Sequence, residues 1–415
     1  MSRIDEGAQL LPAAWAFCRA RERRWPSPCL ERWGLVGLVG VVFLLAGLPA
    51  IGTPRVPSDD AAVLERVPAA AETRKLEPLR RAVATHPDDL KSAFALAQGY
   101  LDIGRTTADP RFVSYAQAVL SPWLSRPRPD PVVLTWTATS LQYLHRFEEA
   151  LDLLDRATAA QPQNGEAWLT KATILQVLGR FQAARRACQP LTLTNGQLIA
   201  LGCLTSVNSL TGRLRESYSA LRSVYVDDPR IPLNIRVWIL DELADMALRA
   251  GDPTEAEKYW LAVLRAAPRD AYSKSAYADL LLQQHRETEV VHLLRADEQQ
   301  DNLLLRLAIA GTRLRMVDGR RWSALFEARY EAALRADDFT HAREHARFLL
   351  EVRGDSAGAL RLAARNWQIQ REPADVRVYL AAARAAGNRP ALQIIQEWIA
   401  QTGYEDRSAS ADTLP

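Results

Sequence analysis

The sequence predicts an all-α fold: a solenoid of stacked helix-turn-helix repeats preceded by one N-terminal transmembrane helix. Two observations carry this prediction. Short turn signals recur along most of the 415 residues at nearly constant spacing, and one long apolar stretch without charge lies near the N-terminus. A hydrophobic content of 48% allows a core that runs continuously through the stacked repeats.

The turn signals define the repeat. Successive signals are 33 to 41 residues apart, and most intervals are close to 34. Such a unit has room for two short helices and cannot bury its apolar faces alone, so neighbouring units must stack. The signals are Gly104-Arg105, His145-Arg146, Gly179-Arg180, Gly212-Arg213, Gly251-Asp252, His285-Arg286, Gly319-Arg320, Gly354-Asp355 and Gly387-Asn388.

The N-terminal region predicts a signal anchor. Residues 33–53 contain no charged residue and are long enough to cross a bilayer as a helix. Residues 1–32 form a basic segment, which the positive-inside rule keeps in the cytoplasm, so that the repeats are exported. The alternative is a cleaved signal peptide, with a weak small-residue site at 50–52, and it exports the repeats as well. Residues 54–75 are expected to form a linker.

The repeats are expected to fill residues 76–404. A short helix at 76–85 ends before His86-Pro87, because the residue before a proline avoids helical backbone angles. Longer intervals predict insertions near residues 106–110 and 227–232. Residues 405–415 are polar and small, which is typical of a disordered tail.

Within a repeat, bulky and small residues alternate along each helix so that two backbones can approach closely. One repeat shows this pattern in full: Trp168, Ala172, Leu175, Gly179, Phe181 and Ala184. These residues resemble the tetratricopeptide repeat, as do Leu96, Ala97, Tyr100 and Gly104, and Leu243, Ala244, Ala247, Gly251, Ala256 and Pro268. The resemblance covers residues 90–402 and is loose after Gly319. It implies a right-handed solenoid of about eight or nine repeats.

The resemblance also implies where a partner binds, because first helices line the concave face of tetratricopeptide solenoids. For each residue the alternative is ordinary repeat packing or plain surface. Transferred position by position, that role falls on Phe94, Gln98, Thr139, Tyr143, Glu166, Thr173, Gln176, Trp238, Asp241, Asp245, Arg249, Tyr272 and Asp279. Trp238 and Tyr272 are the most interesting of these, since aromatic residues anchor interfaces.

The cysteines follow the predicted topology. Cys18 and Cys29 lie on the cytoplasmic side and should remain thiols. Cys188 falls in the second helix of one repeat and Cys203 in the first helix of the next, so the two could face each other. Two independent core cysteines are the favoured interpretation, and a disulfide is the alternative.

No active site, cofactor site or metal site is predicted. The segment His341-Ala342-Arg343-Glu344-His345 matches the H-x-x-E-H order of zinc peptidases, but a third ligand lacks a convincing candidate. A solvated helix face is therefore the favoured interpretation of this segment. His145 and His285 take the position of the turn glycine, which favours a helix-end role over catalysis.

The functional prediction is a non-catalytic interaction scaffold or assembly adaptor in the bacterial inner membrane, with its solenoid in the periplasm. Its partners are expected to be proteins of the cell envelope. A formal charge of +3 lacks the basic excess of a nucleic-acid binder. A polysaccharide secretion factor that binds sugar along Trp238 and Tyr272 is the first alternative. A zinc-dependent hydrolase using His341 and His345 is the second.

Overall fold

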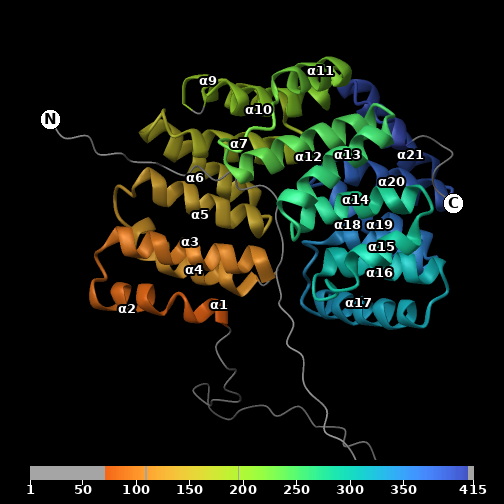
Figure 1. Ribbon diagram of the computed structural model, residues 1–415, viewed down its shortest axis with the longest axis horizontal. Helices are drawn as coiled ribbons and strands as arrows, with labels where there is room; N and C mark the ends of the chain where they lie inside the picture. Colours follow the sequence, from red (N-terminus) through yellow and green to blue (C-terminus); the bar gives the residue numbers. More distant parts are fainter. Residues whose placement is uncertain (1–70, 108–109, 195, 410–415) are drawn as a thin grey trace, which may run out of the picture. The chain divides into compact units, whose positions relative to one another are not determined.

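The computed structural model describes residues 71–107, 110–194 and 196–409. Contacts divide the chain into two units, whose described parts are 71–77 and 78–409. Over these ranges the regular structure is helical and contains no strand (Figure 1). The all-α prediction is confirmed. The first unit contributes α1 (Ala71–Arg74), a single helical turn inside the segment predicted to be a linker.

Helix pairs in chain order make up the second unit. After α2 (Glu77–Thr85), which coincides with the predicted short helix, the described residues form nine pairs. The pairs are α3 (Leu90–Thr107) with α4 (Pro110–Leu124), α5 (Pro131–Tyr143) with α6 (Phe147–Ala160), α7 (Gly165–Val177) with α8 (Phe181–Cys188), α10 (Gln197–Ser209) with α11 (Leu214–Val224), α12 (Leu233–Arg249) with α13 (Pro253–Ala266), α14 (Ala271–Gln283) with α15 (Glu287–Leu294), α16 (Asp301–Arg313) with α17 (Val317–Arg335), α18 (Ala342–Phe348) with α19 (Ser356–Trp367), and α20 (Pro373–Ala385) with α21 (Arg389–Thr402). Three short elements accompany them: α9 (Leu191–Thr194), the π-helical turn η1 (Leu349–Arg353) and the 3₁₀ turn η2 (Arg407–Ala409).

Local sequence explains why the helices begin and end where they do. Asp130 and Asn388 accept hydrogen bonds from the backbone N–H groups of Val132 and Ala391, at 2.8 and 3.0 Å, and so cap α5 and α21. Between the helices of most pairs the chain passes through a left-handed residue, as at Gly251 with φ +88°. Glycine takes this conformation without strain because it has no Cβ atom. His145 also takes it, at φ 54°, and there the Cβ atom makes the left-handed backbone less favourable.

Two predicted turns are wrong. Gly104 lies inside α3, which continues to Thr107, so the longer interval there reflects a longer helix. Gly319 lies inside α17, and the left-handed residue of that turn is Arg315, with φ 53°. Gly319 instead allows α16 and α17 to touch: a Cβ on Gly319 would lie 2.4 Å from the carbonyl carbon of Gly311. The second predicted insertion is confirmed by the loop at 225–232.

The contact between Gly311 and Gly319 yields a prediction. Gly319→Ala should lower the free energy of unfolding by about 2 kcal/mol, because the added methyl group meets backbone that must move. Urea unfolding followed by circular dichroism measures the change. Arg320→Ala is the control, since its exposed side chain leaves the same helix one residue later. Equal stability of the two variants would contradict the argument.

Cys188 and Cys203 form a disulfide that joins α8 to α10, with their Cα atoms 5.7 Å apart. The favoured interpretation of two independent cysteines is therefore wrong. The two residues lie on the second helix of one pair and the first helix of the next, and these helices pack against each other. Both residues are buried, at 0% and 4% exposure, so the bridge lies within the core.

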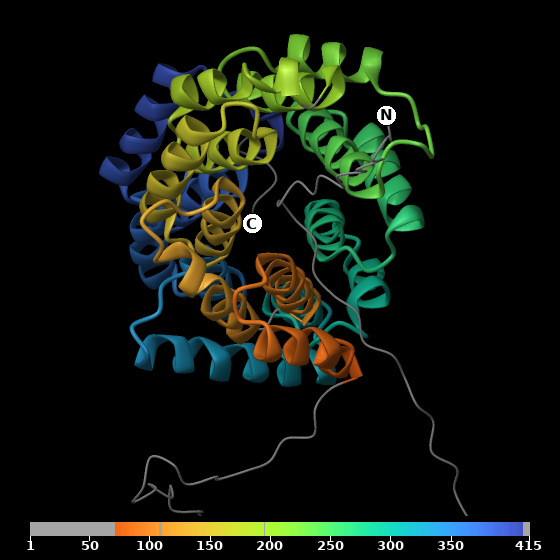
Figure 2. The same cartoon turned by 90° about the vertical axis from the view of Figure 1, so that its left-hand side faces the viewer.

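The last helix pairs contact turns that precede them by about 200 residues. The backbone N–H of Arg371, between α19 and α20, donates to the carbonyl of Val177 at 2.8 Å. The amide nitrogen of Gln370 lies 3.3 Å from Nδ1 of His145, and Trp398 of α21 packs on Phe181. In Figure 2 these last helices (blue) lie beside the yellow helices α5–α8. The contacts join the second and third pairs to the last two.

The ends of the chain differ in part from expectation. The predicted disordered tail is ordered as far as residue 409, because Asp406 accepts hydrogen bonds from Arg377 and Tyr404 at 2.8 and 2.9 Å. The predicted cytoplasmic segment, 1–32, and membrane helix, 33–53, lie outside the described residues. None of the helices within the described ranges has both the length and the apolar character needed to cross a membrane.

Candidate functional site

A cavity of about 200 Å³ lies among the first helices of successive pairs. Side chains of α7, α10, α12, α14, α16, α18 and α20 line it, together with Trp260 of α13. We call it the inner cavity. Seven residues predicted from the sequence lie in its wall: Gln176, Trp238, Asp241, Asp245, Arg249, Tyr272 and Asp279.

The remaining predicted residues lie elsewhere. Phe94 packs edge-on against Trp136, with ring centroids 5.3 Å apart. The hydroxyls of Thr139 and Thr173 donate to backbone carbonyls of their own helices, at 3.1 and 3.0 Å. Gln98, Tyr143 and Glu166 are partly buried. The structure therefore gathers only the later half of the predicted set at one place.

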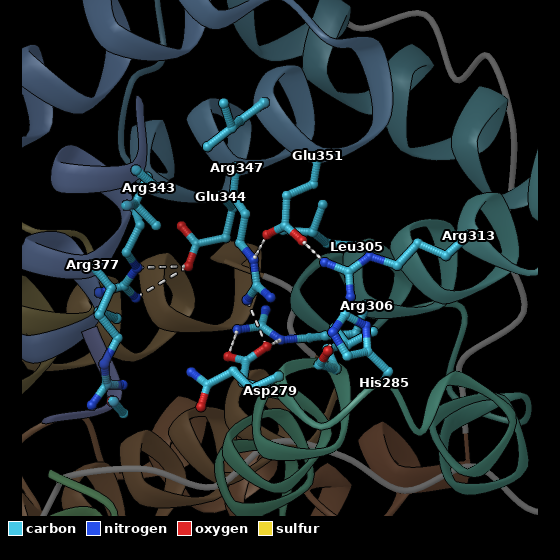
Figure 3. A pocket seen from close by; sticks show the side chains of 17 residues that line it. Asp279, His285, Leu305, Arg306, Arg313, Arg343, Glu344, Arg347, Glu351 and Arg377 are labelled. Atoms are coloured by element: carbon cyan, nitrogen blue, oxygen red, sulfur yellow. Dashed lines mark hydrogen bonds and ion pairs between the residues drawn. The ribbon is translucent and has the colours of Figure 1, made fainter. Parts of the chain in front are cut away.

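Arginine–carboxylate pairs form much of the wall. Figure 3 shows a second pocket that shares Asp279, Arg306, Arg343, Glu344 and Arg377 with the inner cavity. Arg306 of α16 holds Asp279 of α14 through two hydrogen bonds, at 2.9 and 2.6 Å. Arg343 of α18 contacts Glu372 and Asp375 at 2.8 and 3.1 Å. Because Arg306 and Arg347 approach Asp279, they lower the pKa of its carboxyl, although burial acts in the opposite direction. These pairs tie first helices of different repeats together.

Sequence reasoning missed the arginines of this wall. Arg306, Arg343 and Arg377 come from the last three pairs, where the repeat pattern is loose and a charged residue resembles ordinary helix surface. The available signal was their place in first helices, since the predicted residues were also taken from the first helices of their repeats.

Two carboxylates in the inner cavity form no ion pair with a described residue. Asp245, Asp279, Glu344 and Glu372 each pair with an arginine, whereas Asp241 and Glu242 do not, although Arg249 acts on Glu242 from a greater distance and lowers its pKa. Asp241 instead accepts from the hydroxyl of Ser273, at 2.9 Å, and the indole N–H of Trp238 donates to Glu242, at 3.2 Å. Burial raises the pKa of both groups, that of Glu242 to about 7.

A stability prediction follows from Glu242. Its folded pKa is about 7 and its ordinary value is 4.5, so the folded state holds an extra proton between these pH values. Stability therefore falls as pH rises through this window. Glu242→Gln should remove that fall and raise the free energy of unfolding at pH 8 by about 1–2 kcal/mol, with no gain at pH 4. Urea unfolding at both pH values tests this; a gain of equal size at both would contradict it.

In the structure, the side chains of His341, Glu344 and His345 from the H-x-x-E-H segment lie in different surroundings. His345 is buried at 7% exposure and packs on Tyr330 of α17, with ring centroids 4.4 Å apart. Glu344 faces the inner cavity beside Arg343, and His341 stands edge-on to His145. A solvated face is therefore the wrong interpretation for His345, whose pKa burial lowers to about 4. Among the described residues, no group of three or more metal-binding side chains occurs.

Comparisons with known proteins decide the kind of repeat. A family model described as tetratricopeptide repeat matches residues 143–200, and a second of the same description matches residues 242–289. The chain contains tetratricopeptide repeats. Each match includes a complete first helix that lines the inner cavity, α7 in the first match and α14 in the second. No curated protein matches the chain.

Solved structures with tetratricopeptide-like folds are similar at low identity. The human IFIT1 dimer matches with 12% identity and a TM-score of 0.40, over 80% of this chain and 87% of that one. The APC/C Cut9–Hcn1 assembly matches with 12% identity and a TM-score of 0.39, over 79% of this chain and 52% of that one. A tetratricopeptide repeat protein from Parabacteroides merdae matches with 12% identity and a TM-score of 0.32, over 74% and 98%.

Proposed function

We propose that the chain is a non-catalytic scaffold or assembly adaptor that holds another protein of the bacterial cell envelope. Residues 33–53 anchor it in the inner membrane, and the repeats lie in the periplasm. The observation that carries the proposal is the inner cavity, to which the first helices of seven successive pairs contribute. Tetratricopeptide repeats generally mediate contacts between proteins, and their first helices are the usual contact surface.

The disulfide supports the periplasmic placement. Disulfides persist in oxidising compartments and are rare where thioredoxin and glutathione keep thiols reduced. The bridge between Cys188 and Cys203 joins two helices of the solenoid. It therefore supports placing the repeats in the periplasm, across the membrane from the basic N-terminal segment.

Site-specific crosslinking tests the scaffold. A photoreactive phenylalanine at Tyr272, in the inner cavity, should capture a discrete envelope protein in living cells. The same group at Glu216, an exposed residue of α11, is the matched control and should not capture it. Identical adducts from both positions, or none from Tyr272 in a variant with native circular dichroism, would contradict the scaffold proposal.

Reporter fusions test the location separately. Alkaline phosphatase joined after residue 409 should be active, because it folds only after export. Activity of a cytosolic reporter alone at that position would contradict the periplasmic placement and leave the scaffold proposal intact.

A further inference from the structure

Six carboxyl groups and four arginines line the inner cavity. Of the six carboxylates in its wall, four have an arginine partner, as described above, and every wall arginine is already paired. Asp241 and Glu242 remain on adjacent positions of α12. Burying carboxylates without a counter-charge is unfavourable, so a cation that enters the cavity removes an existing cost.

A second observation, on an aromatic side chain of another helix, also points to a ligand. Trp260 reaches the cavity from α13 and is 2% exposed. Its indole nitrogen lies near Asp241 and lowers the pKa of that carboxyl, yet it is buried without a hydrogen bond of normal geometry. A buried donor in this state favours a ligand that brings an acceptor oxygen.

Aromatic side chains complete the wall. Trp238 and Tyr272 line the same cavity on either side of the acidic pair along the chain, and the faces of such rings attract organic cations. A volume of about 200 Å³ exceeds the roughly 30 Å³ of one water molecule several-fold, so a long side chain fits.

We infer that the inner cavity receives a basic side chain, arginine or lysine, of a polypeptide partner, with its cationic end at Asp241 and Glu242. The ammonium or guanidinium group supplies the missing positive charge, and a backbone carbonyl of the partner supplies an acceptor for Trp260. This inference rests on the proposed function, since it states the chemistry by which the scaffold recognises its partner.

Calorimetric titration of the purified full-length protein tests the inference. The probe is N-acetyl-arginine amide, and the matched ligand is N-acetyl-citrulline amide, which has nearly the same shape without the charge. The arginine probe should bind at least about tenfold more tightly than the citrulline compound. Asp241→Asn/Glu242→Gln should remove this difference, and Glu216→Gln, on the exposed face of α11, should retain it.

The pH dependence provides a further readout, because arginine itself does not titrate below pH 8. The charged and titratable groups around Glu242 are Asp241, Asp245 and Arg249 on α12, Tyr272 on α14, and Glu372 and Arg377 at α20. The pKa of Glu242 is about 7, so affinity for the probe should rise about tenfold between pH 6 and pH 8. Glu242→Gln should reduce that rise.

Several outcomes would overturn the inference. They are equal binding of the citrulline compound, unchanged affinity in the double variant, or no binding of the arginine probe. Tighter binding of spermidine than of the arginine probe would assign the cavity to a polyamine and overturn it too. Crosslinking at Tyr272 that persists unchanged in the double variant would overturn the inference and leave the proposed function in place.

Discussion

Replacing Arg343 with methionine should lower the free energy of unfolding at pH 8 by about 3–5 kcal/mol, the range for removing one partner of a buried ion pair. Arg343 binds Glu372 and Asp375 at 2.8 and 3.1 Å, and it also contacts Glu344. Asp375 is 2% exposed. Methionine keeps the length of the side chain but leaves three carboxylates without their cation. Urea unfolding of the purified protein measures the loss.

The dependence of this loss on pH identifies its cause. Burial already raises the pKa of Glu372 and Asp375, and Arg343 opposes that rise. Without Arg343 both values rise further, so the folded variant holds more protons than the unfolded chain and loses stability as pH increases. The loss should therefore be smaller at pH 5 than at pH 8.

Arg361→Met on α19 is the control, because this exposed arginine faces solvent in the neighbouring helix. Its effect should stay within about 0.5 kcal/mol. A loss in Arg343→Met that is independent of pH would show that packing, and not the carboxylates, accounts for the effect.

The order of helices could be predicted because each pair is specified by nearby residues. A left-handed residue in the turn ends one helix, and a capping Asp or Asn begins the next. Each of these signals involves only residues a few positions apart in the sequence. Gly179, Gly251 and Gly387 show the first, and Asp130 and Asn388 show the second. The wrong turn at Gly319 has a different origin. A glycine can also serve a close helix contact, and Gly319 does so against Gly311, a residue that the turn pattern does not include.

The inner cavity could be predicted only in part, since it depends on which helices meet. The concave positions of α12 and α14 follow from the repeat, and five predicted residues from Trp238 to Tyr272 lie in the wall. Some partners of the wall residues come from distant helices: Arg377 of α20 lies 3.8 Å from Asp245, and Asp279 pairs with Arg347 of α18 across 68 positions. No local sequence pattern predicts a contact between residues so far apart in the chain. The contact between Arg371 and Val177 was missed for the same reason.

Removing the disulfide should also have a large effect. Cys188→Ala/Cys203→Ala is expected to lower the free energy of unfolding by about 3 kcal/mol, because the bridge closes a loop of 15 residues and restricts the unfolded chain. The buried positions of both residues mean that alanine also leaves some space in the core, which adds to the loss. Urea unfolding without reductant measures it.

Adding reductant distinguishes the stability that the disulfide provides from the stability that is lost through packing in the double variant. Dithiothreitol added to the unfolded wild-type protein should lower its stability on refolding, while the double variant should not respond. Wild-type protein made in an oxidising compartment should carry no titratable thiol at Cys188 or Cys203, and protein made in the bacterial cytoplasm should carry two. If reductant left the wild-type protein unchanged, chain restriction would not be the source of its stability, and the link between this bridge and an oxidising compartment would lose its support.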